Sequence, residues 1–161
     1  MDARGQPIIA NYWCPEGSDI PQYHVLRFDG TSWRAMQATR RTAPFALGGT
    51  GTKRPPISRS VLLPVLVPHF RQSLHLVFRD DGRAGRIVSA SCPDLDAPEP
   101  VWDLRELTTE SVGAWEPSLD PGAAAEGRLE MLVQRVEQRD GNDRQAATAP
   151  PAPIFSLSWR P

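Results

Sequence analysis

The sequence predicts an all-β protein, and three observations support this fold class. Seventeen prolines and twelve glycines divide the 161 residues into short segments, and most of these segments alternate or run apolar in the manner of strands. Helical periodicity is almost absent, since only residues 123–126 are locally helical in composition and this stretch is too short for a stable helix. Aspartate–glycine pairs, which favour hairpin turns because glycine accepts positive φ, separate some of the strands.

Nine strands are expected, and turn residues separate them. Asp29-Gly30 lies between two strand-like runs and predicts a hairpin, and Asp81-Gly82 predicts another with a slightly longer loop. The carboxylates of Asp80 and Asp81 are adjacent and point to opposite faces, so turn capping is favoured over calcium binding. The expected strands are residues 7–13, 23–29, 33–39, 58–66, 74–80, 86–91, 102–107, 129–136 and 154–159.

The strands also recur in a pattern along the chain. An apolar run, a second strand that ends in aspartate and a third strand entered through tryptophan occur about two and a half times. A repeat of roughly 50 residues with four short antiparallel strands is typical of a β-propeller blade, and a β-sandwich is the alternative. The sequence therefore predicts about three blades of four-stranded antiparallel sheet, over residues 1–57, 58–114 and 115–161.

Three blades are too few to close a propeller, which typically has about four to eight. We therefore expect an incomplete ring whose end sheets expose apolar faces and open edges, which are surfaces for self-association. A C-terminal fragment of a longer propeller is the favoured explanation. Assembly of the chain with itself and an open arc are the alternatives.

Composition excludes several kinds of partner. The net charge of -1 gives no long-range field to attract nucleic acid or an anionic membrane, so neither is expected. No apolar run is long enough for a transmembrane helix, and the N-terminus lacks the organisation of a signal peptide, which leaves the cellular location undetermined. Cys14 and Cys92 are expected to be buried thiols, and the cysteines and histidines show no zinc-ligand spacing. Neither a metal nor a cofactor is predicted.

The segment 41–59, RTAPFALGGTGTKRPPISR, is the most informative stretch for function. Its glycines allow a ligand to approach the backbone closely, and Lys53, Arg54 and Arg59 place cations beside them. It follows neither a Walker loop nor a dinucleotide fingerprint, because prolines 55 and 56 stand where the helix of either motif would begin. An anionic or polyhydroxylated ligand is therefore expected, with an irregular loop bearing solvated charges as the alternative.

The chain resembles a known group of proteins over nearly its whole length. The resemblance is carried by IIANYWCPEGSDIPQYHV, RTAPFALGGTGTKRPPISR, LHLVFRDDGRAGRIVSA, SVGAWEPSLD and PPAPIFSLSWRP. Together these stretches are similar to the C-terminal portion of the BNR-repeat family of seven-bladed β-propellers, which includes ulvan lyases and related rhamnose–glucuronate-active enzymes. The glycine loop and residues 143–150 depart from the pattern expected for that family.

The resemblance implies a carbohydrate-active protein, a polysaccharide lyase or glycosidase acting on glycans that contain uronic acid. Its partner would be an acidic oligo- or polysaccharide. The family characteristically places catalytic histidine, tyrosine and arginine residues on earlier blades, so this chain is expected to be incomplete for catalysis. A non-catalytic glycan- or protein-binding β-repeat module is the alternative, and a degenerate remnant is a third interpretation.

Five residues are candidate substrate contacts. A guanidinium can hold a uronate carboxylate through two parallel bonds, which favours Arg54 with Lys53 and Arg59 beside it. Trp115 could stack on a sugar ring while Glu116 bonds its hydroxyls. The alternative for Arg54 and Arg59 is that they brace neighbouring blades through backbone carbonyls.

The remaining aromatic and histidine residues are assigned by their place in the repeat. His24 is a weak catalytic candidate, since a neutral imidazole is a general base, but alternation puts it on one face with Leu26 and Phe28, which favours a structural role. The tryptophans divide into two groups. Trp13 and Trp115 are expected to be exposed, and Trp33, Trp102 and Trp159 to lie in the core between blades.

Overall fold

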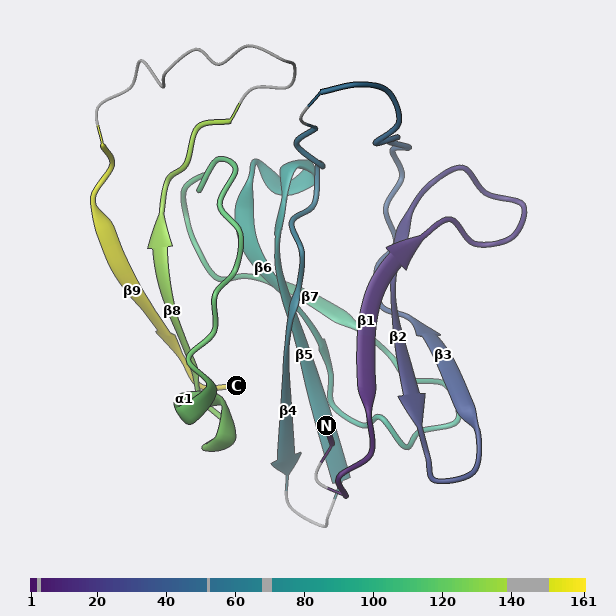
Figure 1. The fold of residues 1–161 in the computed structure, drawn as a ribbon. Helices are drawn as coiled ribbons and strands as arrows, with labels where there is room; N and C mark the ends of the chain where they lie inside the picture. Colours follow the sequence, from purple (N-terminus) through teal and green to yellow (C-terminus); the bar gives the residue numbers. More distant parts are fainter. Residues whose placement is uncertain (3, 52, 68–70, 139–150) are drawn as a thin grey trace.

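The computed structural model describes residues 1–2, 4–51, 53–67, 71–138 and 151–161, and it is all-β (Figure 1). Strands account for 42% of the chain and helix for 6%. All nine expected strands are present. They are β1 (Ile8–Trp13), β2 (Gln22–Phe28), β3 (Trp33–Gln37), β4 (Val61–Val67), β5 (Arg71–Asp80), β6 (Arg86–Cys92), β7 (Asp103–Glu106), β8 (Leu129–Gln134) and β9 (Ile154–Trp159).

The strands form three separate antiparallel sheets that do not close into a barrel, as expected for an incomplete propeller-like fold. The first sheet has the order β1-β2-β3, the second β4-β5-β6-β7, and the third β8-β9. Figure 1 shows the three sheets side by side, with the middle sheet between the other two. The three sheets follow one another along the chain, and each sheet is built from one continuous stretch of sequence.

The described part of the third sheet has two strands where a full blade would have four. The segment before β8 lies beside this strand. One isolated β-bridge joins Leu119 to Met131, and the Asp120 backbone N–H donates to the Glu130 carbonyl. Prolines at 117 and 121 flank this segment and lack the N–H groups that a ladder needs. The chain then enters the short helix α1 (Pro121–Ala125), which Asp120 caps through the N–H groups of Gly122 and Ala123.

The turns predicted from aspartate–glycine pairs are confirmed. Gly30 has a φ of +102° in the β2–β3 hairpin, where Asp29 accepts bonds from the next backbone N–H groups. The β5–β6 connection contains a 3₁₀ turn, η2 (Asp81–Arg83), which the Asp80 side chain caps by accepting from Gly82 N–H. Asp80 therefore has the capping role expected from the sequence.

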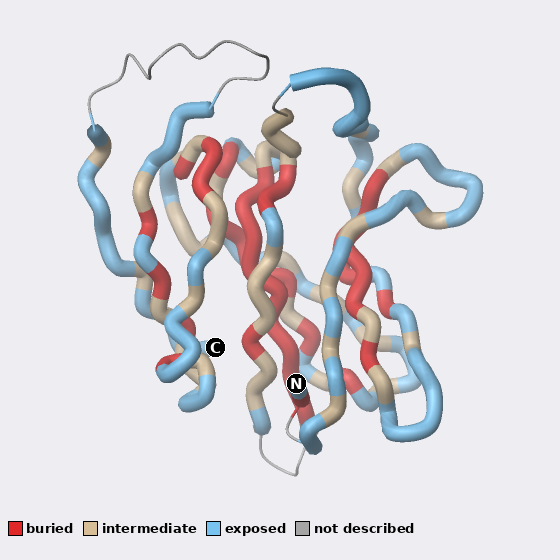
Figure 2. Tube along the Cα trace, viewed as in Figure 1, coloured by how far each residue is buried: buried red, intermediate tan, exposed pale blue. Residues whose placement is uncertain are grey.

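The middle sheet is buried on both faces, because each face packs against a neighbouring sheet (Figure 2). Leu74, Leu76 and Phe78 of β5 belong to the core shared with the first sheet, whereas Val77 belongs to the core shared with the third. These four side chains are fully buried. Residues 74–78 of β5 are therefore apolar except for His75, and they do not alternate strictly between apolar and polar.

The first and third sheets each have one face without a neighbouring sheet. Ile9 and Trp33 of the first sheet are 48% and 53% exposed, and Leu132 and Ile154 of the third are 67% and 63% exposed. This is the exposure of apolar end faces predicted for an incomplete ring. Among the described residues, no helix has the length and apolar character to cross a membrane.

Candidate functional site

Arg54 lies at the end of the molecule where β5 ends and η2 begins, and it is held by protein groups. Its Nη2 atom is 2.7 Å from Asp81 Oδ1 and donates to the carbonyl of Gly113 at 3.1 Å. Gly113 precedes the third sheet, so Arg54 ties the glycine-rich segment to two other parts of the chain. This arrangement favours the bracing role considered for Arg54 in the sequence.

Arg79 completes this ion-pair cluster, and sequence reasoning did not identify it as a functional residue. Its side chain is fully buried, and Nη1 lies 2.6 Å from Asp81 Oδ1. The guanidinium also donates to the carbonyls of Pro55 and Pro56, at 2.7 and 3.3 Å. Because Arg54 and Arg79 share Asp81, we call these three residues the arginine brace.

Arg59 and Glu116 form a second contact at the same end. Glu116 Oε2 accepts from the Arg59 backbone N–H at 2.8 Å and lies 3.4 Å from its Nε. The Arg59 side chain is 84% exposed, so its charge faces solvent. Burial and the negative charge of Glu116 raise the pKa of Tyr12. The sequence candidates Arg54, Arg59 and Glu116 thus lie at one end of the fold.

Lys53 and Trp115 differ in their availability to a ligand. Lys53 is half-buried and folds back toward Gly49, where an added Cβ would lie 3.9 Å from the lysine Nζ. Trp115 is only 5% exposed, packs in the core between the second and third sheets, and donates from Nε1 to the Leu132 carbonyl. The expectation that Trp115 is exposed is therefore wrong, because the third sheet covers it.

The other tryptophans follow the sequence prediction with one exception. Trp13 is 37% exposed, as expected, and Trp102 and Trp159 pack against the two cores. Trp33 is 53% exposed instead of buried, because its face of the first sheet has no neighbouring sheet. The repeat pattern predicts which face a residue occupies but not whether that face is covered.

His24 is buried beneath Trp13, with ring centroids 3.9 Å apart and planes 14° apart. Its Nδ1 lies 3.0 Å from the Gln22 carbonyl. Since a carbonyl only accepts, Nδ1 carries the proton and Nε2 keeps a lone pair. Burial lowers the pKa of His24, which keeps the imidazole neutral. The ring has the protonation state of a base, but the strand register confirms the shared face with Leu26 and Phe28.

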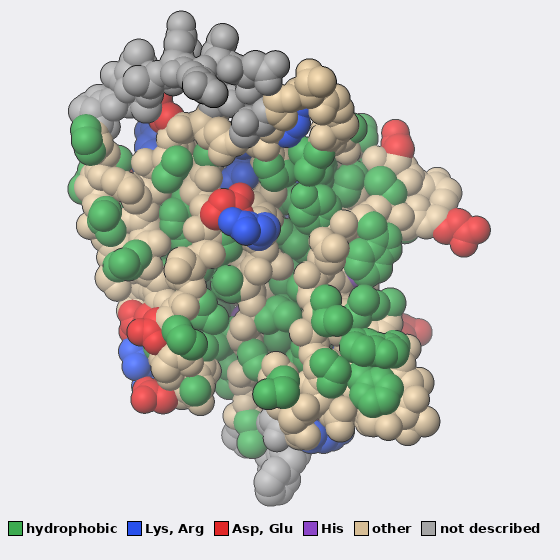
Figure 3. Space-filling view, in the orientation of Figure 1, with side chains coloured by type: hydrophobic (Ala, Val, Ile, Leu, Met, Phe, Trp, Pro, Cys, Tyr) green, Lys and Arg blue, Asp and Glu red, His purple; other side chains and the backbone are tan. Residues whose placement is uncertain are grey.

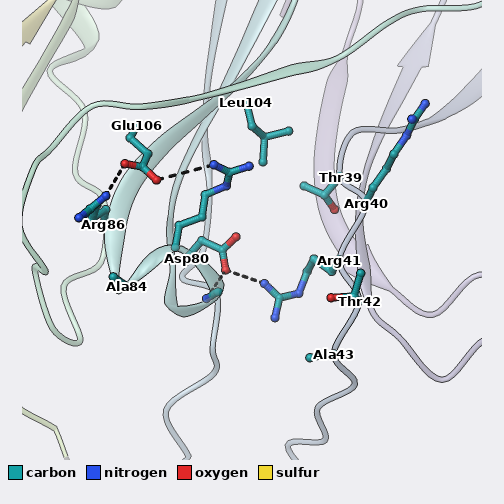
Figure 4. A pocket seen from close by; sticks show the side chains of 12 residues that line it. Thr39, Arg40, Arg41, Thr42, Ala43, Asp80, Ala84, Arg86, Leu104 and Glu106 are labelled. Carbon is teal, nitrogen blue, oxygen red and sulfur yellow. Dashed lines mark hydrogen bonds and ion pairs between the residues drawn. The ribbon is translucent and has the colours of Figure 1, made fainter.

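A groove of about 520 Å³ between the first and second sheets holds residues that the sequence reasoning missed (Figure 4). One wall is the segment 39–43, which Gln22 fixes by bonding both the N–H and the carbonyl of Arg41. The other wall comes from η2, β6 and β7. Its charged lining residues are Arg40, Arg41, Arg83, Arg86, Asp80 and Glu106, and we call this site the arginine groove.

Cations outnumber anions in the arginine groove, with four arginines and two carboxylates in its lining. Arg41 is paired with Asp80 at 2.7 Å, and both side chains are more than nine-tenths buried. Arg83 and Arg86 share Glu106, at 3.7 and 2.5 Å (Figure 4). Arg40 is exposed and has no ion pair with any described residue. The groove therefore carries positive charge that the described protein groups do not neutralise.

Hydrogen-bond donors around the groove are also unsatisfied. Five buried side-chain nitrogen or oxygen atoms of the described residues lack a hydrogen-bond partner, and three of them are Arg41 Nε, Arg86 Nε and Trp102 Nε1. Trp102 lines a smaller hollow of about 310 Å³ that shares Arg40, Arg83 and Leu104 with the groove. Buried donors without partners are rare in folded proteins. Arg79 Nε of the arginine brace is another, so this incomplete pairing of buried donors occurs in both clusters.

A sequence signal for the groove exists but is weak. Arg40 and Arg41 follow a predicted strand, and Arg83 and Arg86 follow the Asp81-Gly82 pair of the next repeat. Only the packing of the first sheet on the second brings the two pairs together. A search for basic pairs at strand ends of consecutive repeats would have found them.

Thiol and metal chemistry have little structural support in the described residues. Cys14 is exposed and Cys92 is buried, and both are free, so the expectation of a buried thiol holds only for Cys92. Burial raises the pKa of the Cys92 thiol. No group of three or more His, Cys, Asp or Glu side chains gathers among the residues that the structure describes.

Comparison with known proteins gives no family assignment. The chain matches no protein-family model, and no curated protein sequence is significantly similar to it.

Proposed function

We propose that this chain is a β-propeller-like module that binds acidic oligo- or polysaccharides in the arginine groove without cleaving them. The observation that supports it is the excess of arginine over carboxylate in a hollow between two sheets. The resemblance to the BNR-repeat family, whose members act on glycans that contain uronic acid, supports the same ligand class.

The chemistry of the groove suits a carboxylate on a sugar ring. A guanidinium is a planar fork that bonds both oxygens of a carboxylate, and Arg40 offers this fork to solvent. The longer contact of Arg83 to Glu106, 3.7 Å, leaves it able to turn toward a ligand while Arg86 keeps Glu106 paired. The adjoining hollow adds the apolar surface of Leu104 and Trp102 for the face of a sugar ring.

Binding is favoured over catalysis because the groove lacks an assembled acid–base set among its described residues. An elimination at a uronate needs a base near the proton at C5 and an acid near the leaving oxygen. The groove is lined by arginines and by carboxylates that already pair with them. His24 lies on the face of the first sheet that points away from the second sheet. The lyase or glycosidase activity implied by the resemblance stays a prediction.

Calorimetric titration with an oligoglucuronate tests this proposal, with a neutral glucan as the control ligand. The wild-type chain should bind the oligoglucuronate and not the glucan, and Arg40→Ala combined with Arg83→Ala should weaken binding by at least about tenfold. Arg160→Ala removes the same charge from an exposed position and should leave the affinity unchanged. Arg59→Ala tests the sequence candidate and should also have little effect.

Three results would contradict the proposal. They are the absence of oligoglucuronate binding, equal losses in the groove and Arg160→Ala variants, and a loss confined to Arg59→Ala. A rise in the absorbance of unsaturated uronate on incubation with the polymer would show elimination and overturn the non-catalytic assignment.

A further inference from the structure

The face of the first sheet that points away from the second sheet carries no formally charged residue. Strand register defines this face, because His24 pairs with Asn11 on one side and with Gln37 on the other. Its members alternate with the residues that pack on the second sheet. They are Ile9, Asn11 and Trp13 of β1, Gln22, His24, Leu26 and Phe28 of β2, and Trp33, Ala35 and Gln37 of β3. We call this surface the neutral face.

Large apolar side chains lie open to solvent on the neutral face. Trp33, Ile9 and Trp13 are 53%, 48% and 37% exposed. Trp33 contacts Phe28 with ring centroids 5.4 Å apart, and Ile9 is paired with Leu26 across β1 and β2. Figure 3 shows hydrophobic side chains gathered over β1 and β2 at the right of the view. An apolar surface of this kind on a folded protein marks an interaction site.

The way in which the sheets already pack indicates what covers this face. The second sheet buries its two faces against the first and third sheets, so face-to-face sheet packing forms both cores of the chain. A neutral face can meet a copy of itself without repulsion between like charges. The uncovered face of the third sheet is different, because it includes Glu130 paired with Arg128.

We propose that two copies of this chain associate through their neutral faces, first sheet on first sheet, around a two-fold axis. A two-fold interface uses the same patch on both copies, which suits an uncharged and self-complementary surface. Trp33 and Trp13 supply the large aromatic side chains that dominate such interfaces. Burial also lowers the pKa of His24 and keeps this residue uncharged. Gln37 of the neutral face also lines the hollow beside the arginine groove, but Ile9, Trp13 and Trp33 line neither, so this inference does not rest on the proposed function.

Sedimentation equilibrium over a range of protein concentrations tests the association. The wild-type chain should approach twice the 17.8 kDa of a single chain as concentration rises. Trp33→Lys should shift the dissociation constant upward by at least about tenfold. Ile9→Lys, a second exposed position on another strand, should do the same. Leu132→Lys is the matched control, because Leu132 is exposed on the third sheet.

Circular dichroism of each variant shows whether it is folded. The dissociation constants of Trp33→Lys and Ile9→Lys are compared with that of wild type only if the variants are folded. A wild-type chain that stays monomeric at all concentrations would overturn the proposal, whatever other protein or glycan then binds the face. Dissociation by Leu132→Lys to the same extent would show that the third sheet forms the contact. A head-to-tail arrangement would then replace the two-fold one.

Discussion

The arginine brace and the arginine groove contain the same side chain in two different chemical settings. In the brace, Arg54 and Arg79 converge on Asp81 and on the carbonyls of Pro55, Pro56 and Gly113. In the groove, Arg83 and Arg86 share a single carboxylate and Arg40 has no ion-pair partner among the described residues. Both clusters hold two arginines for each carboxylate. The backbone carbonyls that accept from the brace, and the exposed Arg40 of the groove, therefore separate the structural cluster from the candidate binding site.

The brace should dominate stability, and replacement of its buried member should have the largest effect. Arg79→Ala removes a fully buried side chain, leaves Asp81 with Arg54 alone and takes the donor from the Pro55 carbonyl, which should lower the free energy of unfolding by about 3–4 kcal/mol. Urea unfolding followed by circular dichroism measures the change. Arg40→Ala is the matched control from the groove and should stay within about 0.5 kcal/mol of wild type. Similar losses in both variants would remove the distinction between the two clusters.

Acid should destabilise the fold through the buried imidazole of His75, because protonation places a charge inside the core. His75 packs against Trp159 and bonds Ser91, and burial lowers its pKa to about 4. The unfolded chain binds the proton near its ordinary pKa of about 6.5. Stability should therefore be complete above that pH and fall as the pH drops toward 4, by on the order of 3 kcal/mol.

Urea unfolding at several pH values checks this dependence. His75→Asn should remove most of the change between pH 6.5 and 4, since no group titrates at that position. An unchanged pH dependence in this variant would assign the acid sensitivity to other groups.

Arg54→Ala should have a smaller effect than Arg79→Ala, because the Arg54 side chain is 27% exposed and Arg79 still contacts Asp81. The expected loss in the free energy of unfolding is about 1–2 kcal/mol. Its affinity for an oligoglucuronate should match that of wild type when the folded variant is titrated. A selective loss of binding would return Arg54 to the role of ligand contact that the sequence suggested.

Arg83→Lys should have the smallest effect of the four. The substitution keeps the charge of the groove but removes the planar fork, so affinity for an oligoglucuronate should fall a few-fold, by about 1 kcal/mol. Calorimetry against Arg83→Ala measures the difference. Equal affinities in Arg83→Lys and wild type would mean that charge alone holds the ligand.

The strands were predictable because their signals are local. All nine strands are present, and the structure has turns at Asp29-Gly30 and Asp81-Gly82, as the sequence predicts. Burial was less predictable, because it depends on which sheet face meets another. Trp115 is covered by the third sheet, whereas Trp33 lies on the neutral face and is exposed.

The candidate site was predictable only in part for the same reason. Sequence reasoning identified the cations of the glycine-rich segment, but Arg54 finds its partner on η2 and at Gly113, far along the chain. The groove unites Arg40 with Arg83 through sheet packing, and no local pattern contains that contact. Pairing partners of charged groups must therefore be known before a basic cluster is assigned to binding.

Hydrogen–deuterium exchange of the folded chain with and without an oligoglucuronate tests the central claim most directly, because it reports which backbone segments the ligand protects. We predict that protection increases in residues 39–43 and 82–84, which line the arginine groove, and stays unchanged in residues 53–59. Protection confined to residues 53–59 and 113–116 would place the ligand at the arginine brace and contradict the assignment to the groove.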